Sequence, residues 1–501
     1  MSETRSPEEV LREAGLADPT TQLADYIRRQ RWFSGRDRQL AHVDVEDAGT
    51  LEGEPLLVPA MLRVSYTEGG SDLYHVPLAV RRAGAQVEGV VAEGSRGGDA
   101  VVVSDALLDD AAGSRFWQLL GNRRMQMARG ELAGVVEPGV ESDSVAPVHH
   151  LPRDQSNTML VRDDSELLKC FRRLEGVSSP EFEMLQALKR AGFTHIPAPS
   201  GVIEYRVEGQ EPVVVAMAQP FLHNATDGWA LAMTSLRDIY AEAEQREGGP
   251  PDDATIRELV DDQGSDFTPE AERLGTVVAE MHLALSREGV PEGLRAEVAD
   301  AARLRAWATE MEEDLAAFSE TEAARSVSVP ALRARIEAVR RLRAEDGRPP
   351  GGLAIRVHGD LHLGQTTRTD SGWMILDFEG EPSRTVEARR RRASPLRDVA
   401  GMLRSFDYAA AVALLDRADP DDADWAMLQR YADTWAVVNR EAFWSAYVAA
   451  VGDAPLLPSP AQVPRLLEAY LVQKALYEVA YEQGHRPDWA WIPLRFLETM
   501  K

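Results

Sequence analysis

The sequence predicts an α+β fold in two lobes, a mixed α/β lobe followed by a mainly α-helical one. Apolar runs of strand length occur up to residue 222, at 56–64, 73–80, 165–171 and 213–218. Beyond residue 268, long segments repeat apolar residues at helical spacing, at 271–285, 302–318, 329–342, 426–451 and 463–481. The 501 residues are enough for two to four structural units.

Three parts follow from these patterns. Residues 1–95 combine an opening helix with the first two strands and end in a glycine-rich stretch, GSRGG at 94–98. Residues 96–222 form an intermediate region and a strand-rich lobe that ends in Gln219 and Pro220. Residues 223–501 hold the long helices. We therefore expect an N-terminal subdomain, a first lobe and a helical second lobe.

Lysine is scarce, which makes each lysine informative. Among 55 Lys and Arg residues only four are lysines: Lys169, Lys189, Lys474 and Lys501. A position that keeps lysine favours a compact ammonium that a planar guanidinium cannot replace. Lys169 lies in the strand at 165–171, which follows a turn at 162–164. Its retention therefore indicates a specific contact, although four residues also leave chance as an alternative.

A helix follows this strand. Ser179 or Ser178 is a suitable cap, and Pro180 suits the first helical turn. We expect Glu183 to face Lys169 as its ion-pair partner. Glu181 lies about 200° around the helix from Glu183, which predicts only a favourable charge near the helix N-terminus.

Residues 357–382 carry the strongest functional signal. They read VHGDLHLGQ at 357–365 and WMILDFEGEP at 373–382. The turn TDSG lies between two apolar runs, at 353–357 and 373–376, which we expect to pair as a hairpin. Kinases need a carboxylate that orients the acceptor hydroxyl, then an amide oxygen and a second carboxylate for Mg²⁺. Asp360, Gln365 and Asp377 fit these roles in that order. Gln365 follows Asp360 by five residues, the offset of the metal-binding Asn in protein kinases.

The remaining ATP contacts follow from this kinase interpretation. Lys169 should bind the phosphates. The polar loop that runs into the strand before the Lys169 strand should cover them with donors from Ser156, Asn157 and Thr158. The exit of the strand at 213–218 corresponds to the hinge between the lobes. We expect the adenine edge there, at Gln219, Phe221 and Leu222.

The acceptor should bind near a helix in the C-terminal segment. Lys474, Tyr477 and Tyr481 recur at i, i+3 and i+7, so one helical face presents an ammonium and two phenols. Aromatic rings cover the apolar side of a pyranose, and polar tips bind its hydroxyls. We assign His362 to the acceptor as well, beside Asp360. A packed helix with polar ends is the alternative.

These motifs resemble those of the actinobacterial maltokinases, relatives of the aminoglycoside phosphotransferases with a protein-kinase-like fold. The resemblance extends to RRQRWFSGR at 28–36, SPLRDVAGMLRSFDY at 394–408, and the segment 473–487. It implies that residues 1–95 form a cap subdomain. It also implies that ATP and Mg²⁺ serve to phosphorylate the anomeric hydroxyl of maltose. The product, maltose 1-phosphate, would link the protein to trehalose and α-glucan enzymes.

Two alternatives remain open at this point. A glucosamine kinase, or a kinase for another aminosugar, would share the catalytic motifs and differ in the acceptor helix. Such a site should direct acidic side chains at the ammonium of the sugar, and Lys474 argues against that. A non-catalytic regulatory module is the more distant alternative, and the intact catalytic motifs argue against it.

Composition excludes several partners. The net charge of −27 repels nucleic acid and anionic membrane surfaces. The only cysteine, Cys170, rules out an internal disulfide framework, which fits a reducing cytoplasm. The N-terminus lacks the pattern of a signal peptide, and no apolar run reaches the length of a membrane helix. We expect a cytoplasmic enzyme with small-molecule substrates.

Overall fold

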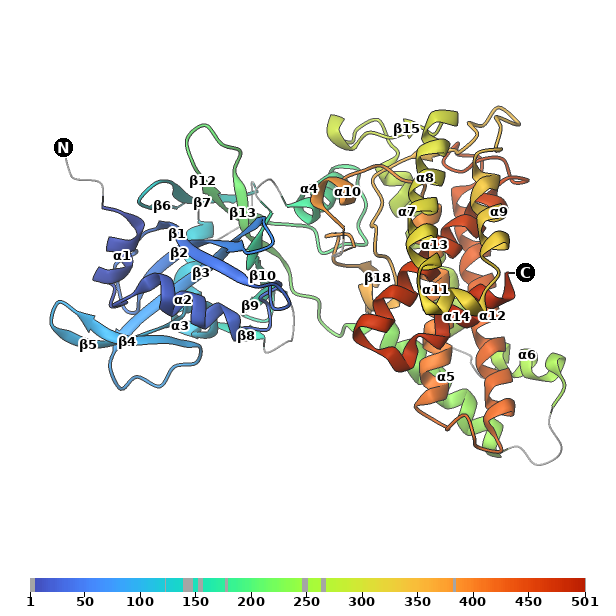
Figure 1. Cartoon of the computed structure of the whole chain (residues 1–501), viewed down its shortest axis with the longest axis horizontal. Coiled ribbons are helices and arrows are strands. Elements are labelled where there is room, and N and C mark those ends of the chain that lie inside the picture. The colour runs from blue at the N-terminus through green and yellow to red at the C-terminus, as the bar shows by residue number, and fades with distance from the viewer. Residues whose placement is uncertain are drawn as a thin grey trace. The chain divides into compact units, whose positions relative to one another are not determined.

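The computed structural model divides the chain into two compact units, which are described separately (Figure 1). The first comprises Met1–Glu183 and Pro197–Leu222, and the second Met184–Ile196 and His223–Lys501. The structure describes residues 5–121, 123–137, 147–151, 156–175, 179–245, 251–262, 267–381 and 384–500. None of the helices described within these ranges is both long and apolar enough to cross a membrane.

The first unit opens with two short helices on an antiparallel sheet. The helices are α1 (Pro7–Glu13) and α2 (Pro19–Arg28). Their apolar faces pack on the sheet and form a core that includes Leu11, Leu23 and Ile27. The strand order is β1-β2-β3-β5-β4, and β11 also pairs with β3. The strands are β1 (Leu40–Ala48), β2 (Leu56–Tyr66), β3 (Ser71–Arg82), β4 (Val90–Arg96), β5 (Asp99–Asp105) and β11 (Arg173–Leu174).

The glycine-rich stretch at 94–98 contains the turn of a β-hairpin. Gly97 and Gly98 have positive φ angles of 60° and 95°, and they form the turn of the β4–β5 hairpin. Glycine adopts such angles without steric cost, so the stretch makes a tight turn between paired strands. A subdomain boundary at residue 95 would therefore cut through a hairpin.

A second antiparallel sheet completes the first unit. Its order is β6-β7-β12-β13-β10-β9-β8, and α3 (Asp110–Trp117) packs on β8. The expected strands around Lys169 and before Pro220 are confirmed as β10 and β13, which pair with each other. The strands are β6 (Arg124–Gln126), β7 (Glu131–Val136), β8 (Val148–Leu151), β9 (Thr158–Arg162), β10 (Glu166–Cys170), β12 (Gly201–Arg206) and β13 (Val213–Pro220).

The second unit is mainly helical, as expected. Its long helix α12 packs along α7 and α11, and α13 packs on α8, α9 and α11 (Figure 1). Trp435, Phe406 and Phe443 are fully buried between these helices. The helices are α5 (Gly228–Gln245), α6 (Asp253–Asp262), α7 (Phe267–Leu285), α8 (Ala301–Ser319), α9 (Val329–Val339), α10 (Val386–Arg389), α11 (Leu396–Leu415), α12 (Trp425–Val451), α13 (Val463–His485) and α14 (Trp491–Thr499).

The strands near the catalytic motif pair differently from our expectation. The hairpin consists of β17 (Thr366–Thr369) and β18 (Gly372–Ile375), and β17 also pairs with β14 (Thr226–Asp227). The apolar run at 353–357 is not its partner. Within that run, β16 (Leu353–Ala354) pairs with β15 (Glu297–Val298). Residues 358–365, between this run and β17, therefore form a loop and do not connect two paired strands.

The helix after the Lys169 strand is α4 (Pro180–Arg190). The side chain of Ser179 accepts a hydrogen bond from the N–H of Phe182 at 3.4 Å, which confirms it as the cap.

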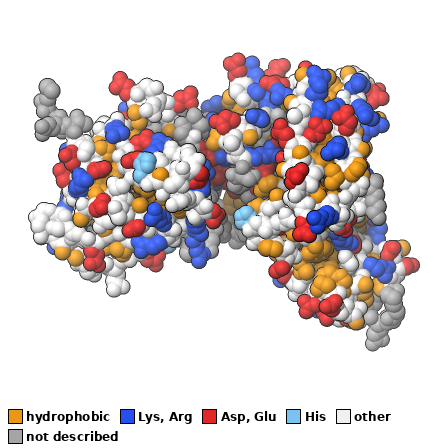
Figure 2. Space-filling view, viewed as in Figure 1, with side chains coloured by type: hydrophobic (Ala, Val, Ile, Leu, Met, Phe, Trp, Pro, Cys, Tyr) orange, Lys and Arg blue, Asp and Glu red, His pale blue; other side chains and the backbone are white. Residues whose placement is uncertain are grey.

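Basic and acidic side chains are interspersed on the face of the molecule that Figure 2 shows. The large negative net charge is therefore not gathered into one patch on that face.

Candidate active site

A single helix holds the loop that contains Asp360. The loop follows β16, and its backbone is fixed by Asp398 in the first turn of α11. The carboxylate of Asp398 accepts the N–H of His358 at 2.7 Å and the N–H of Gly359 at 2.8 Å. Gly359 has a φ of 87°, a conformation that favours glycine. Asp398 therefore sets the backbone turn immediately before Asp360.

Two further residues on the same face of α11 contact the loop. A Cβ on Gly401 would lie 2.5 Å from the carbonyl oxygen of Leu361, so only glycine permits this close approach. The hydroxyl of Ser405 accepts the N–H of Leu363 at 3.2 Å. Asp398, Gly401 and Ser405 are spaced at i, i+3 and i+7, which places them on one side of the helix. The loop is thus built on α11.

Asp398 is itself held in a buried network. His282 on α7 lies 3.1 Å from its carboxylate, and the other ring nitrogen of His282 lies 2.9 Å from the hydroxyl of Tyr447. Burial would raise the pKa of Asp398, but the contacts with His282 and the N–H of Gly359 lower it overall. His282 is fully buried, so it acts as a packed structural residue that holds Asp398.

Asp360 forms an ion pair with Lys474 on α13. The Nζ atom of Lys474 lies 3.1 Å from Oδ1 of Asp360. Burial opposes the charge on Asp360, but Lys474 and His362 lower the pKa of the carboxyl below its ordinary value. Burial likewise opposes the charge on Lys474, and Asp360 and Glu478 raise the pKa of its ammonium. Both groups are therefore charged at neutral pH, and Asp360 can accept a hydrogen bond from a hydroxyl.

A cavity opens beside this ion pair within the helical unit. Charged and polar side chains dominate its lining, and Tyr470 and Tyr477 add aromatic walls. Glu381 is buried there and accepts hydrogen bonds from Arg384 at 2.9 Å and Arg397 at 3.1 Å. The lining residues are Gly359, Asp360, Leu361, Glu381, Arg384, Arg397, Gly401, Tyr470, Gln473, Lys474 and Tyr477. A polar group that enters the cavity therefore meets Asp360 and Lys474 together.

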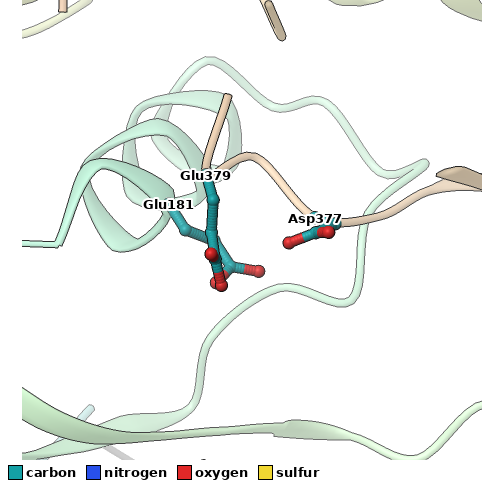
Figure 3. A group of neighbouring side chains, drawn as sticks. All are labelled: Glu181, Asp377 and Glu379. Atoms are coloured by element: carbon teal, nitrogen blue, oxygen red, sulfur yellow. The ribbon is translucent and has the colours of Figure 1, made fainter. Parts of the chain in front are cut away.

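The loop after β18 carries the carboxylates that could hold a metal ion. Asp377 and Glu379 come from this one loop, and their carboxylate oxygens lie within 4.8 Å of each other (Figure 3). The side-chain amide of Gln365 donates to Asp377 at 3.2 Å. Asp377 has a φ of 61°, which aspartate tolerates better than most residues. These hard oxygen donors fit Mg²⁺.

The ion pair in the first unit differs from our expectation. The Nζ atom of Lys169 lies 2.7 Å from the carboxylate of Glu181, and both side chains are buried. We had expected Glu183 in this position and had treated Glu181 only as a charge at the helix start. The start of α4 directs Glu181 toward β10, and Glu183 lies on a different side of the helix.

Other residues expected to contact ATP lie in more varied settings. The Thr158 hydroxyl is buried and accepts a hydrogen bond from Arg172 at 2.9 Å, and Asn157 donates to Ser156 at 3.3 Å. Ser156 is the exposed member of the three. The N–H of Phe221 donates to the carbonyl oxygen of Ser165 at 2.9 Å, so the pairing between these strands continues past Pro220 and uses this group. The adenine contacts at Gln219, Phe221 and Leu222 remain predictions.

Two expected acceptor residues lie outside the cavity lining. His362 caps the short 3₁₀ turn at Leu363–Gln365, where its Nδ1 accepts the N–H of Gly364 at 3.1 Å. Tyr481 is 40% exposed and stacks on His485 instead. Lys474 and Tyr477 do line the cavity. Tyr477 and Tyr481 share a face of α13, but only Tyr477 lines the cavity.

Sequence reasoning gave no role to Asp398, Glu381, Arg397 or Gln473. Asp398 and Arg397 lie in the SPLRDVAGML segment. An aspartate directly before an apolar helical run could have indicated that Asp398 binds backbone N–H groups near the start of a helix. Gln473 directly precedes Lys474, and its amide donates to Asp314 at 2.7 Å. Glu381 follows the metal loop, yet nothing in its spacing distinguished it from Glu379.

The chain is similar over most of its length to known sugar kinases. The family model of the maltokinase N-terminal cap domain matches residues 26–109. A glucosamine kinase of Streptacidiphilus jiangxiensis is 30% identical over 344 residues, which cover 68% of this chain and 70% of that protein. A crystal structure of a glucosamine kinase matches with a TM-score of 0.63 and 25% identity, covering 93% of this chain and 94% of the other. A second structure, a glucosamine kinase with glucosamine, ADP and inorganic phosphate, matches with a TM-score of 0.62 and 24% identity over 94% and 97% of the two chains.

Proposed function

This chain belongs to the maltokinase-like kinases of the aminoglycoside phosphotransferase superfamily, and from that premise we propose that it phosphorylates the anomeric hydroxyl of maltose. Its relatives are sugar kinases, and the chain is accordingly an ATP-dependent phosphotransferase of sugars. The choice of maltose and of the anomeric position is our proposal.

The observation that carries the proposal is the ammonium of Lys474 beside Asp360. An acceptor hydroxyl that hydrogen-bonds to Asp360 must lie close to this cation. A neutral sugar tolerates the ammonium and can donate or accept around it. The cation of an aminosugar would be repelled at such short range. The match of residues 26–109 to a maltokinase cap domain supports the same choice.

The proposed reaction uses each residue in one role. Lys169, held by Glu181, contacts the phosphates of ATP. Gln365, Asp377 and Glu379 would hold Mg²⁺, which neutralises charge on the phosphate oxygens when it is bound. Asp360 orients the anomeric hydroxyl and accepts its proton as the oxygen attacks the γ-phosphorus. Lys474 keeps Asp360 ionised before the transfer.

Glucosamine is the second candidate acceptor. The relatives and solved structures described above are glucosamine kinases, and one of these structures contains glucosamine. The cavity also has buried Glu381, and Asp314 lies behind Gln473. Both carboxylates already have cationic or amide partners in this chain, which compete with a substrate ammonium.

The test is a comparison of ATP consumption with maltose, glucosamine and glucose under identical conditions. Phosphorus NMR of the product then shows which oxygen carries the phosphoryl group. We expect the highest kcat/KM with maltose and an anomeric phosphate. Asp360→Asn is the control, because loss of the base should lower kcat by roughly 10²- to 10⁴-fold. A preference for glucosamine, or phosphorylation at another hydroxyl, would contradict the proposal.

A further inference from the structure

Aromatic side chains continue along α13 from the cavity toward the end of the helix. Tyr477 lines the cavity, and its ring centroid lies 6.1 Å from that of Tyr481. The Tyr481 ring stacks on His485 at 4.3 Å with an interplanar angle of 17°. The three positions are four residues apart, so they follow one side of the helix. We refer to Tyr477, Tyr481, His485 and Trp489 as the aromatic ladder.

The outer end of the ladder is held in place by Arg486. Its guanidinium lies 4.1 Å from the ring centre of Trp489 and 5.6 Å from that of Tyr481. Two hydrogen bonds of 2.9 and 2.8 Å tie the same guanidinium to Glu482, which is buried. The rings are thus fixed in orientation, although Tyr481 and His485 are exposed and Trp489 is half-buried.

The chemistry of the proposed reaction determines where a longer substrate must extend. An α-1,4-linked glucose chain has one anomeric hydroxyl, at its reducing end. That hydroxyl has to lie at Asp360, where its oxygen bonds to the γ-phosphorus, ADP leaves and the proton passes to the carboxylate. Every further glucose unit must therefore point away from Asp360. The ladder starts at the cavity wall and continues away from it with the exposed rings of Tyr481 and His485 and the half-buried ring of Trp489.

We infer that the aromatic ladder is an extended acceptor site, and that the enzyme phosphorylates α-1,4-glucose oligomers longer than the disaccharide. The inference rests on the proposed function. Fixed aromatic rings cover the apolar faces of pyranoses, and the exposed guanidinium of Arg486 borders them with donors for hydroxyls. His485 and Trp489 would contact glucose units beyond the second.

The test compares kcat/KM for maltose, maltotriose and maltotetraose in the full-length enzyme and in two variants, Trp489→Ala and His485→Ala. We expect the parent to phosphorylate all three sugars. In each variant the KM for maltotriose should rise by about tenfold more than the KM for maltose, since a stacked ring is lost from the outer unit only. Trp425→Ala removes a half-buried tryptophan at the start of α12, outside the ladder, and should leave the ratio of the two KM values at the parent level.

Each result bears on a different statement. Turnover of maltose without turnover of maltotriose would overturn the extended site and leave the proposed function intact. Equal changes for both sugars, or none in either variant, would show that the ladder is only helix-end packing. No turnover of any glucose oligomer would overturn the proposed function and the extended site together. Melting temperatures of the variants identify a folding defect, and having two variants keeps the test decisive if one fails to fold.

Discussion

Lys474 contacts Asp360 through an ion pair of 3.1 Å that joins the helix expected to bind sugar to the expected catalytic base. The pair forms within the helical unit, and Glu478, one turn after Lys474, pairs with Arg404 at 2.8 Å. Alternating charges thus continue from the loop into α13 and α11. The acceptor hydroxyl has to enter an arrangement in which the carboxylate already has a partner.

Replacing Lys474 with methionine should move the acid limb of kcat/KM to higher pH. Asp360 is active when ionised, so activity falls as pH decreases through its pKa. The ammonium holds this pKa below its ordinary value, and its removal raises the pKa. Rate profiles between pH about 4 and about 8 measure the shift. Lys189→Met, in the last turn of α4, is the matched control, and an unmoved acid limb in Lys474→Met would refute the electrostatic role.

Asp398→Asn should impair turnover through the loop backbone. The amide has one oxygen, so it cannot accept the N–H groups of both His358 and Gly359 as the carboxylate does. We expect a loss of about 1 to 3 kcal/mol in the free energy of unfolding and a lower kcat at saturating substrates. Urea unfolding and steady-state kinetics measure the two effects. A parent-like kcat in a protein of reduced stability would mean that Asp398 only supports the fold.

The two glutamates of α4 form a matched pair for testing the Lys169 contact. Glu181→Gln removes the charge that lies 2.7 Å from Lys169, and it should raise the KM for ATP and lower kcat. Glu183→Gln removes the same charge from another side of the same helix and should have a clearly smaller effect. Kinetics with ATP varied at fixed sugar decide the matter. Equal effects in the two variants would point to helix charge instead of the ion pair.

His75 should make the first unit sensitive to acid. It is fully buried in β3, where burial and then the charge of Arg172 lower its pKa from 6.5 to about 3. Between these values the unfolded chain binds a proton that the native protein does not, so stability decreases as pH falls below 6.5. The slope is about 1.4 kcal/mol per pH unit.

His75→Leu removes this contribution while leaving every other titrating group in place. Urea unfolding of both proteins between pH about 6 and about 4 should therefore show a shallower decline for the variant. Parallel declines in the two proteins would mean that His75 does not remain neutral in the native state.

The sequence was a good guide to elements whose signals are local. The strand that carries Lys169, the cap at Ser179 and the long helices of the second unit were all predictable, because spacing and capping chemistry act within a few residues. The hairpin near the catalytic motif was predicted with the wrong first strand, because β18 pairs with β17 and not with the run at 353–357. The run at 353–357 is as apolar as a hairpin strand, and only pairing with a distant strand shows that it belongs elsewhere.

The site was less predictable than the fold. Helical geometry places Glu181 and Glu183 on different sides of α4. It does not say which of the two faces β10, because that depends on how the helix is rotated about its axis. The contacts of Lys474 with Asp360 and of Asp398 with Gly359 join residues far apart in the sequence. Residue spacing along the chain carries no information about such pairs.

The dependence of the catalytic loop on α11 and α13 also bears on protein synthesis. As the chain leaves the ribosome, residues 358–365 emerge before any of the groups that fix them. The loop can be shaped only after residues 398–405 have emerged and packed, and Asp360 meets its ammonium only after residue 474. Nascent chains shorter than this should hydrolyse or transfer no phosphate, so activity reports on the completed folding of the helical unit.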